Sequence, residues 1–162
     1  DQEQAIDRAT EAVHRFPDLY ADAWLDVFRP KLGLGTAEDG DKDLIEGLLS
    51  KMATAGADFT NTFANLAAAP FPDWHDEWSA RLTREGSSPE ASAGLRTTAN
   101  PAVIPRNHRV EAVVEAGVAG DFAPFHDLNR VLATPFELAE ADAHYATPPE
   151  PGEEVTQTFC GT

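Results

Sequence analysis

The chain has 162 residues, the length of one ordinary domain, and carries 12 Lys and Arg against 28 Asp and Glu, a net charge of −16 with neutral histidine. Binding to nucleic acid or to an anionic membrane depends on clustered cations, so we expect neither as a partner. Hydrophobic residues make up 42% of the chain, too many for a disordered acidic tract, so the chain should fold.

Cysteine content and hydropathy indicate the compartment. The sequence has one cysteine, Cys160, and no apolar run of the roughly 20 residues that a membrane span needs. A single cysteine cannot form an internal disulfide framework, which favours a reducing compartment, so we predict a cytoplasmic protein. The chain does not begin with Met, and residues 1–13 already show helical periodicity, so we expect it to be a piece of a longer protein.

The N-terminal third predicts several helices. Apolar residues recur every three or four positions from residue 6 to 16, which indicates an amphipathic helix that Pro17 ends. Asp18 then caps a second helix that stops before Pro30. A turn follows over residues 31–35.

Two more helices follow, each with a candidate cap. Asp41 or Asp43 begins a helix that Gly56 ends, and Asp58 caps a shorter one. In that shorter helix, Phe59 and Phe63 share one face, a spacing that favours the core.

Residues 71–73 open the next predicted helix. It places three apolar side chains on one stripe and three charged ones towards water, namely Trp74, Trp78 and Leu82 against Asp76, Glu77 and Arg81. Three later helices are predicted to begin at candidate caps. The first begins at Ser88 with Pro89, the second begins at Asn107 and stops at Gly120, and the third begins at Asp121.

The fold class is all-α. No alternating run of β-branched residues predicts a strand, and no repeat of 20 to 50 residues recurs. We predict an irregular multi-helix domain over residues 1–135 and an extended, Pro- and Glu-rich C-terminal tail over residues 136–162.

Motifs for metal, phosphate or covalent chemistry are missing from the sequence. The acidic run at residues 39–43 resembles the start of a calcium loop, but Leu44 and Ser50 stand where Gly and Glu are needed. No two histidines lie four residues apart, and there is no glycine-rich phosphate loop and no nucleophile elbow. We therefore predict no metal site, no cofactor and no catalytic residue in this chain.

Three features admit two interpretations each. Trp74 and Trp78 could line a ligand pocket, but the helical spacing favours the core. Arg106-Asn107-His108 could contact a ligand, although we favour a structural role in which Asn107 caps a helix, Arg106 pairs with an acidic neighbour and His108 lies on the surface. Cys160 is either an inert exposed thiol or a redox-active one.

The order of landmarks along the chain resembles the C-terminal part of the selenoprotein O family, also called SelO or YdiU. The resemblance covers essentially the whole chain. The residues that carry it are Trp24, Lys31-Leu32-Gly33-Leu34, Leu48-Leu49, Met52, Asp58-Phe59-Thr60, Phe63, Trp74, Trp78, Arg81, Leu82, Asn100-Pro101, Ile104, Arg106-Asn107-His108, Ala112, Gly120-Asp121-Phe122, Tyr145, Pro148-Pro149 and Cys160.

This resemblance implies a function for the parent protein. The family is bacterial in its YdiU branch, has a protein-kinase-like fold, and transfers AMP from ATP to Ser, Thr or Tyr of proteins with Mg²⁺ as cofactor. Its nucleotide, metal and catalytic residues belong to the part before this segment, so none is assigned here. Its terminal thiol, in the place of Cys160, is thought to form a redox-sensitive disulfide with the kinase-like part, although Gly161-Thr162 departs from the family's serine-rich ending.

Two functions therefore remain open. In the first, the chain packs on the kinase-like catalytic domain of its own parent chain, which acts on protein substrates, and regulates it through Cys160. The site candidates are then Cys160 and the structural motif residues Asn100, Pro101, Arg106, Asn107, His108 and Asp121. In the second, the chain is a free-standing acidic helical module that binds proteins through its acidic surface and the Pro148-Pro149 tail.

Overall fold

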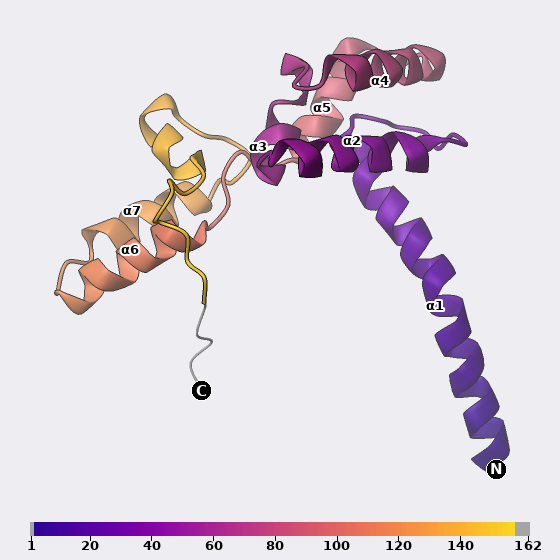
Figure 1. Cartoon of the computed structure of the whole chain (residues 1–162), viewed down its shortest axis with the longest axis horizontal. Helices are drawn as coiled ribbons and strands as arrows, with labels where there is room; N and C mark the ends of the chain where they lie inside the picture. The colour runs from indigo at the N-terminus through magenta and orange to yellow at the C-terminus, as the bar shows by residue number, and fades with distance from the viewer. Residues whose placement is uncertain (1, 158–162) are drawn as a thin grey trace. The chain divides into compact units, whose positions relative to one another are not determined.

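A computed structural model describes residues 2–157, and helices account for all the regular structure in that range. No strand occurs among these residues, which confirms the all-α prediction. In chain order the helices are α1 (Gln2–Lys31), α2 (Asp41–Ala55), α3 (Phe59–Ala64), the 3₁₀ helix η1 (Leu66–Ala68), α4 (Pro72–Glu85), α5 (Pro89–Ala99), α6 (Asn107–Val118), α7 (Ala123–Leu132) and the 3₁₀ helix η2 (Glu140–Ala146), as drawn in Figure 1. None of them is long and apolar enough to cross a membrane.

The described chain forms two compact units. Unit 1 contains residues 2–51 and 71–99, and unit 2 contains residues 52–70 and 100–157, so the chain passes between the units three times. Unit 2 includes the described part of the segment predicted as an extended tail, and in it residues 140–146 form η2. Hydrogen bonds from Asn61 to the Ala146 carbonyl and from Arg109 to the His144 carbonyl hold this helix.

Helix α1 corrects one sequence prediction. It runs without interruption from residue 2 to 31, with Pro17 in its interior, where the sequence predicted two helices divided at that proline (Figure 1). Proline removes one backbone donor and crowds the preceding turn, but strong helix formers such as Arg15 and Leu19 surround it, and the helix continues past the missing bond.

The turn after α1 requires a glycine. Gly33 has a φ of +75°, and a Cβ atom there would lie 2.7 Å from the backbone carbonyl oxygen of Ser92. A larger residue would meet both backbone strain and a steric clash, so glycine allows this turn to pack closely on α5.

Two tryptophans organise the core of unit 1. The indoles of Trp74 and Trp78 stack with ring centroids 5.8 Å apart, and each N–H donates to a backbone carbonyl 2.8 Å away, that of Leu44 for Trp74 and that of Leu32 for Trp78. Burial and hydrogen bonding together confirm their predicted place in the core. The buried apolar side chains of this unit are Leu32, Leu34, Leu44, Ile45, Leu48, Trp74 and Trp78.

Unit 2 has a smaller core. Its buried apolar side chains are Met52, Phe63, Leu66, Val103, Leu128 and Val131. Phe63 is buried as predicted, whereas Phe59, whose ring centroid lies 4.7 Å from that of Phe63, is 46% exposed. In Figure 1, α6 and α7 lie side by side as an antiparallel pair within this unit.

The predicted helix starts agree with the structure at two positions. Asp58 accepts a hydrogen bond from the Asn61 amide, and Ser88 accepts one from the Ala91 amide. Two others shift by one residue. Asn107 is already helical and Arg106 takes the capping position without a side-chain bond, while Phe122 takes the capping position of α7 and Asp121 accepts from the Ala123 amide.

Candidate functional site

Arg81 is buried because of its place on α4. Trp74, Trp78 and Arg81 are spaced by four and three residues, so all three lie on the face of α4 that packs against the rest of unit 1, and the Arg81 side chain is 2% exposed. The prediction from its charge that Arg81 lies towards water is therefore wrong. Its spacing from the two tryptophans was the signal that could have revealed it.

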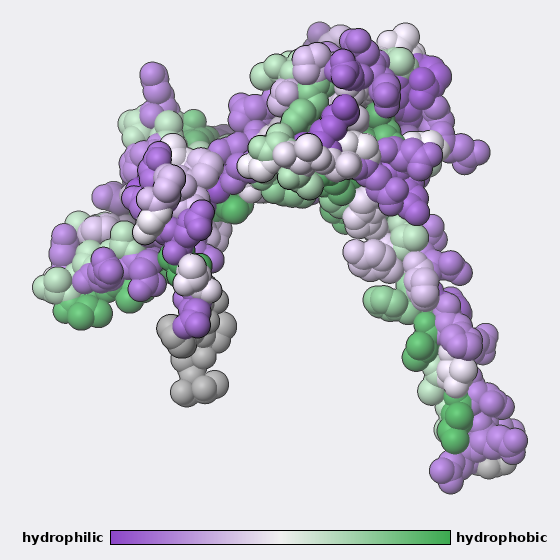
Figure 2. All heavy atoms as spheres, viewed as in Figure 1, coloured by the Kyte–Doolittle hydropathy of each residue, from purple (hydrophilic) through white to green (hydrophobic). Residues whose placement is uncertain are grey.

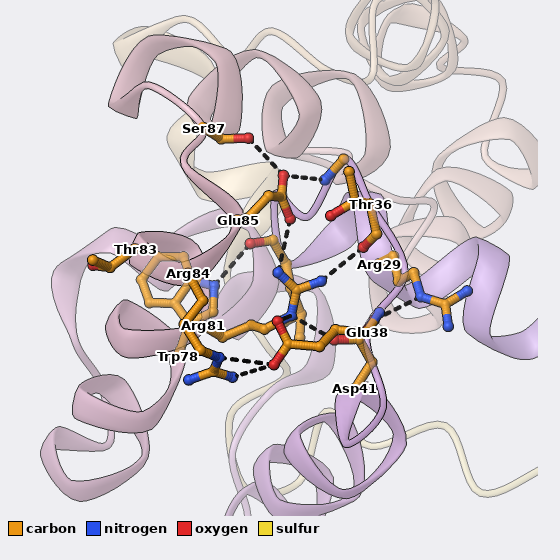
Figure 3. A network of polar contacts seen from close by, with 12 residues as sticks. Arg29, Thr36, Glu38, Asp41, Trp78, Arg81, Thr83, Arg84, Glu85 and Ser87 are labelled. Carbon is orange, nitrogen blue, oxygen red and sulfur yellow. Dashed lines mark hydrogen bonds and ion pairs between the residues drawn. The ribbon is translucent and has the colours of Figure 1, made fainter.

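The Arg81 guanidinium contacts three chain segments at once. Its Nε donates to Asp41 Oδ1 at 2.7 Å, Nη1 to Glu85 Oε2 at 3.0 Å, and Nη2 to the Thr36 carbonyl at 2.7 Å. Figure 3 shows these groups converging on the guanidinium from α4, from the start of α2 and from the turn between α1 and α2. A planar fork with five donors suits this arrangement in a way that an ammonium does not.

Asp41 is the second centre of this network. Its Oδ2 accepts from Arg29 Nε at 2.8 Å and from the Glu38 amide at 2.9 Å, and the side chain is 1% exposed. Burial alone would raise the pKa of Asp41, but hydrogen bonds from Arg81 and Arg29 outweigh it and lower the pKa below its ordinary value. Asp41 is therefore held as a carboxylate.

Glu85 closes the network on its other side. It accepts from the Gly35 amide at 2.8 Å and from the Ser87 hydroxyl, in addition to Arg81. Burial opposes ionisation here too, and the hydrogen bonds from Ser87, Gly35 and Arg81 lower the pKa of Glu85 overall. The cluster is thus a set of matched charges with its donors and acceptors in use, which is the chemistry of a structural clamp.

Arg106 organises a second cluster, in unit 2. Its Nη1 and Nη2 bind the two carboxylate oxygens of Asp58 at 2.8 and 2.9 Å, and Nη2 also reaches Asn61 Oδ1 at 3.3 Å. The pairing confirms the prediction that Arg106 binds an acidic neighbour. The hydrogen bonds from Arg106 lower the pKa of Asp58, outweighing its partial burial.

Asp58 thereby serves two purposes. The same carboxylate that binds Arg106 caps α3 through the Asn61 amide at 2.8 Å, so one side chain fixes both the start of a helix and the entry to α6. Asn61 continues the chain of bonds to the Ala146 carbonyl at 3.1 Å, which ties η2 to α3.

His108 lies next to this cluster and corrects a prediction. It was expected on the surface, but it is 9% exposed because it lies on the inner face of α6. Burial, and then the nearby positive charge of Arg109, lower its pKa, so the ring is held neutral. Arg106 Nε, His108 Nε2 and Arg109 Nε are buried without a hydrogen-bond partner among the described residues.

The other candidates from the sequence have separate positions. Asn100 is buried, Pro101 next to it is half-buried, and Asn107 and Asp121 are exposed. Asn107 borders an open cavity of about 370 Å³ together with Arg106 and His108. Cys160 lies outside the described residues.

Potential ligand sites are modest. Trp78 and Leu82 border an open cavity of about 230 Å³ together with Arg96, whose guanidinium stacks 5.1 Å from the Trp78 ring. Within residues 2–157, no three His, Cys, Asp or Glu side chains are grouped so that they could hold a metal ion. In the acidic run resembling a calcium loop, the Asp41 carboxylate is occupied by Arg29 and Arg81.

Comparison with known proteins identifies the family. The chain is 42% identical to the protein nucleotidyltransferase YdiU of Ruegeria pomeroyi over its full length, 43% identical to that of Nitrobacter hamburgensis over 99% of its length, and 41% identical to that of Alkaliphilus metalliredigens over its full length. The chain belongs to the YdiU family. It spans only 35–36% of the length of these YdiU relatives. No family model matches the chain.

Replacing Arg81 tests the first cluster. Arg81→Met leaves Glu85 and Asp41 buried with their main cation removed, so we expect the free energy of unfolding to fall by about 3–5 kcal/mol. The control is Arg84→Met, three residues further along α4, whose partly exposed ion pair with Glu38 should contribute less than about 1 kcal/mol. Urea unfolding followed by tryptophan fluorescence measures both, and equal losses would contradict the clamp.

A pH series tests the second cluster. A carboxylate whose pKa is lowered in the folded state stabilises the fold above the unfolded pKa of about 4, and this stabilisation is lost as pH falls further through the folded pKa. The stability of Asp58→Asn should therefore be reduced at pH 7 and should change less than that of the wild type below about pH 4. The exposed Glu111→Gln, on α6, should cost less than about 0.5 kcal/mol at pH 7. If the free energy of unfolding falls equally with pH for Asp58→Asn and the wild type, the stabilising role of the Asp58 carboxylate is wrong.

Proposed function

We propose that this chain is the C-terminal helical region of a YdiU-type protein adenylyltransferase, an enzyme that transfers AMP from ATP to Ser, Thr or Tyr of protein substrates. The observation that carries the proposal is similarity to proteins named protein nucleotidyltransferase YdiU along the whole chain, at 41–43% identity, while about two thirds of each relative lies outside the match. The region packs on a kinase-like catalytic domain in that remaining part, in the cytoplasm.

The chemistry of the described residues suits a region that packs on a catalytic domain and does not itself bind the nucleotide. Nucleotidyl transfer needs a metal to hold the phosphates and cations to stabilise the developing charge. The guanidinium groups of Arg29, Arg81, Arg106 and Arg130 are all paired with carboxylates, so they are committed to the fold. The described side chains do not form a Mg²⁺ ligand set, so ATP and Mg²⁺ would bind to the other part of the parent protein.

Cys160 supplies the regulatory part of the proposal. It is the only cysteine of the chain, so any disulfide must join it to a thiol outside residues 1–162. Such a bond would tether the C-terminal end of this region to the catalytic domain and close a long loop, which stabilises a fold when the geometry is unstrained.

An interaction module without catalytic function is the second candidate. The exposed apolar face of α1 and the acidic composition would suit such a module. The genomic reading frame separates the two functions, because a kinase-like domain encoded upstream in the same frame would exclude the free-standing module.

Labelled ATP tests the activity. The protein from the full reading frame should transfer label from [α-³²P]ATP to a protein acceptor in the presence of Mg²⁺, and residues 1–162 alone should transfer none. Labelling from [γ-³²P]ATP serves as the control, since AMP transfer does not retain that phosphate. No labelling by the full-length protein, or labelling by residues 1–162 alone, would overturn the proposal.

Cysteine replacement tests the regulation. With the oxidant diamide, the wild-type full-length protein should show a faster band on a non-reducing gel and altered AMP transfer, and dithiothreitol should reverse both. Cys160→Ser should abolish both responses and leave the melting temperature of the reduced protein unchanged. If wild type and Cys160→Ser respond alike, Cys160 is an inert thiol and the redox role is wrong.

A further inference from the structure

Helix α1 exposes an apolar face that the other residues between 2 and 157 leave uncovered. Every residue from 2 to 23 is exposed, and no residue of the helix is buried. Hydrophobic residues form a band along one side of α1 in Figure 2. Six large apolar side chains are 56–69% exposed there, Ile6, Val13, Phe16, Leu19, Tyr20 and Val27. Soluble proteins rarely leave so long an apolar stripe in water, so this face is built to bind something.

The stripe has a regular spacing. Ile6, Val13, Tyr20 and Val27 recur every seventh residue, and Ala9, Phe16 and Ala23 fall between them, so apolar residues alternate at spacings of three and four. The opposite side of the helix carries acidic residues, Asp7, Glu11, Asp18 and Asp22. This is the pattern of a helix that packs along most of its length against a protein surface.

Polar contacts anchor the C-terminal end of α1 to the rest of unit 1. Arg29 pairs with Asp41 at 2.8 Å, and Lys31 Nζ donates to the Ala99 carbonyl at 3.0 Å. A single helix of this kind gains little stability from its own hydrogen bonds in water, since most helical stability in proteins comes from packing of the apolar face. The exposed part of α1 therefore needs a partner to be stable.

The residues beside the stripe argue against a second copy of the chain. In a two-stranded coiled coil, the flanking positions carry charged residues that pair between helices. Between residues 5 and 27 one such position is charged, Asp26, and it pairs with Arg29 of its own helix at 3.4 Å. The others are Ala5, Thr10, Ala12, Pro17, Leu19 and Trp24. These uncharged residues widen the apolar face, and the net charge of −16 on each copy opposes self-association.

A lipid surface is also a poor match. Helices that lie on membranes carry many Lys and Arg on the polar face, whereas α1 has six acidic residues between positions 3 and 26 and only two arginines there. The remaining candidate is protein surface of apolar character.

We propose that the apolar face of α1, formed by Ile6, Val13, Phe16, Tyr20 and Val27, docks into an apolar groove on the part of the full-length protein that lies outside the match to this chain. This inference rests on the proposed function, and it names the surface through which this region holds the catalytic part. About two thirds of the length of the YdiU relatives is available to form the groove. Docking would bury the wide stripe and leave the acidic side in water.

Amide hydrogen exchange on the full-length protein tests the docking directly. We expect the amides of residues 4–24 to be protected at least about 100-fold over an unpacked helix, to a level comparable with α4, and to remain so on dilution. Exchange within seconds would overturn the proposal. Protection that disappears on dilution, with a mass of two chains at high concentration, would assign the face to a second copy and would also overturn it.

A pair of matched variants adds a second readout. Val13→Gln with Phe16→Gln should speed exchange throughout residues 4–24 and lower the melting temperature of the full-length protein by roughly 5 °C or more. The control, Glu11→Gln with Arg15→Gln, introduces the same residues on the polar side of the same helix and preserves the net charge, so it should change neither. Equal effects of the two pairs would overturn the docking surface.

The outcomes of these measurements can be told apart from those of the tests of the proposed function. AMP transfer by a protein whose α1 is unprotected would overturn the docking surface alone. Protection of α1 in a protein that transfers no AMP would support the docking surface and overturn the proposed activity.

Discussion

The ion pair between Arg81 and Asp41 is the interaction on which unit 1 depends. Each side chain is almost completely buried, and a buried charge is tolerated only when its hydrogen bonds are satisfied. Arg81 brings Glu85 and the Thr36 carbonyl into the same cluster, and Asp41 brings Arg29. The end of α1, the turn that follows, the start of α2 and the end of α4 are therefore held together by one set of charges, beside the stacked tryptophans.

Unit 2 uses the same principle on a smaller scale. Arg106 binds both oxygens of Asp58, which also caps α3, and Asn61 extends the bonds to η2. In each unit an aspartate at the start of a helix is paired with an arginine more than 35 residues away in sequence. The aspartate that begins a helix thereby also makes a tertiary contact. The hydrogen bonds from the arginine lower the pKa of each aspartate.

This use of charge shapes the proposed function. Arg29, Arg81 and Arg106 are committed to carboxylates inside the fold, which suits the proposed role as a region that supports a catalytic domain. The exposed stripe of α1 is the other feature that bears on the proposal, because its side chains are apolar and would be stabilised by packing against another surface. Both features agree with the proposal that this region packs on the rest of a YdiU-type protein, of which the chain matches about a third.

The sequence by itself determined the helical fold class, the caps at Asp58 and Ser88 and the core role of Trp74 and Trp78, because caps and helical periodicity are local and act within a few residues. It also carried the family resemblance. Tertiary structure decided the burial of Arg81 and His108 and the partner of Arg106, since each depends on a segment distant in sequence. It decided as well that α1 continues through Pro17, because an interior proline removes one backbone hydrogen bond without always ending the helix, and a local rule that reads proline as a stop misses this case.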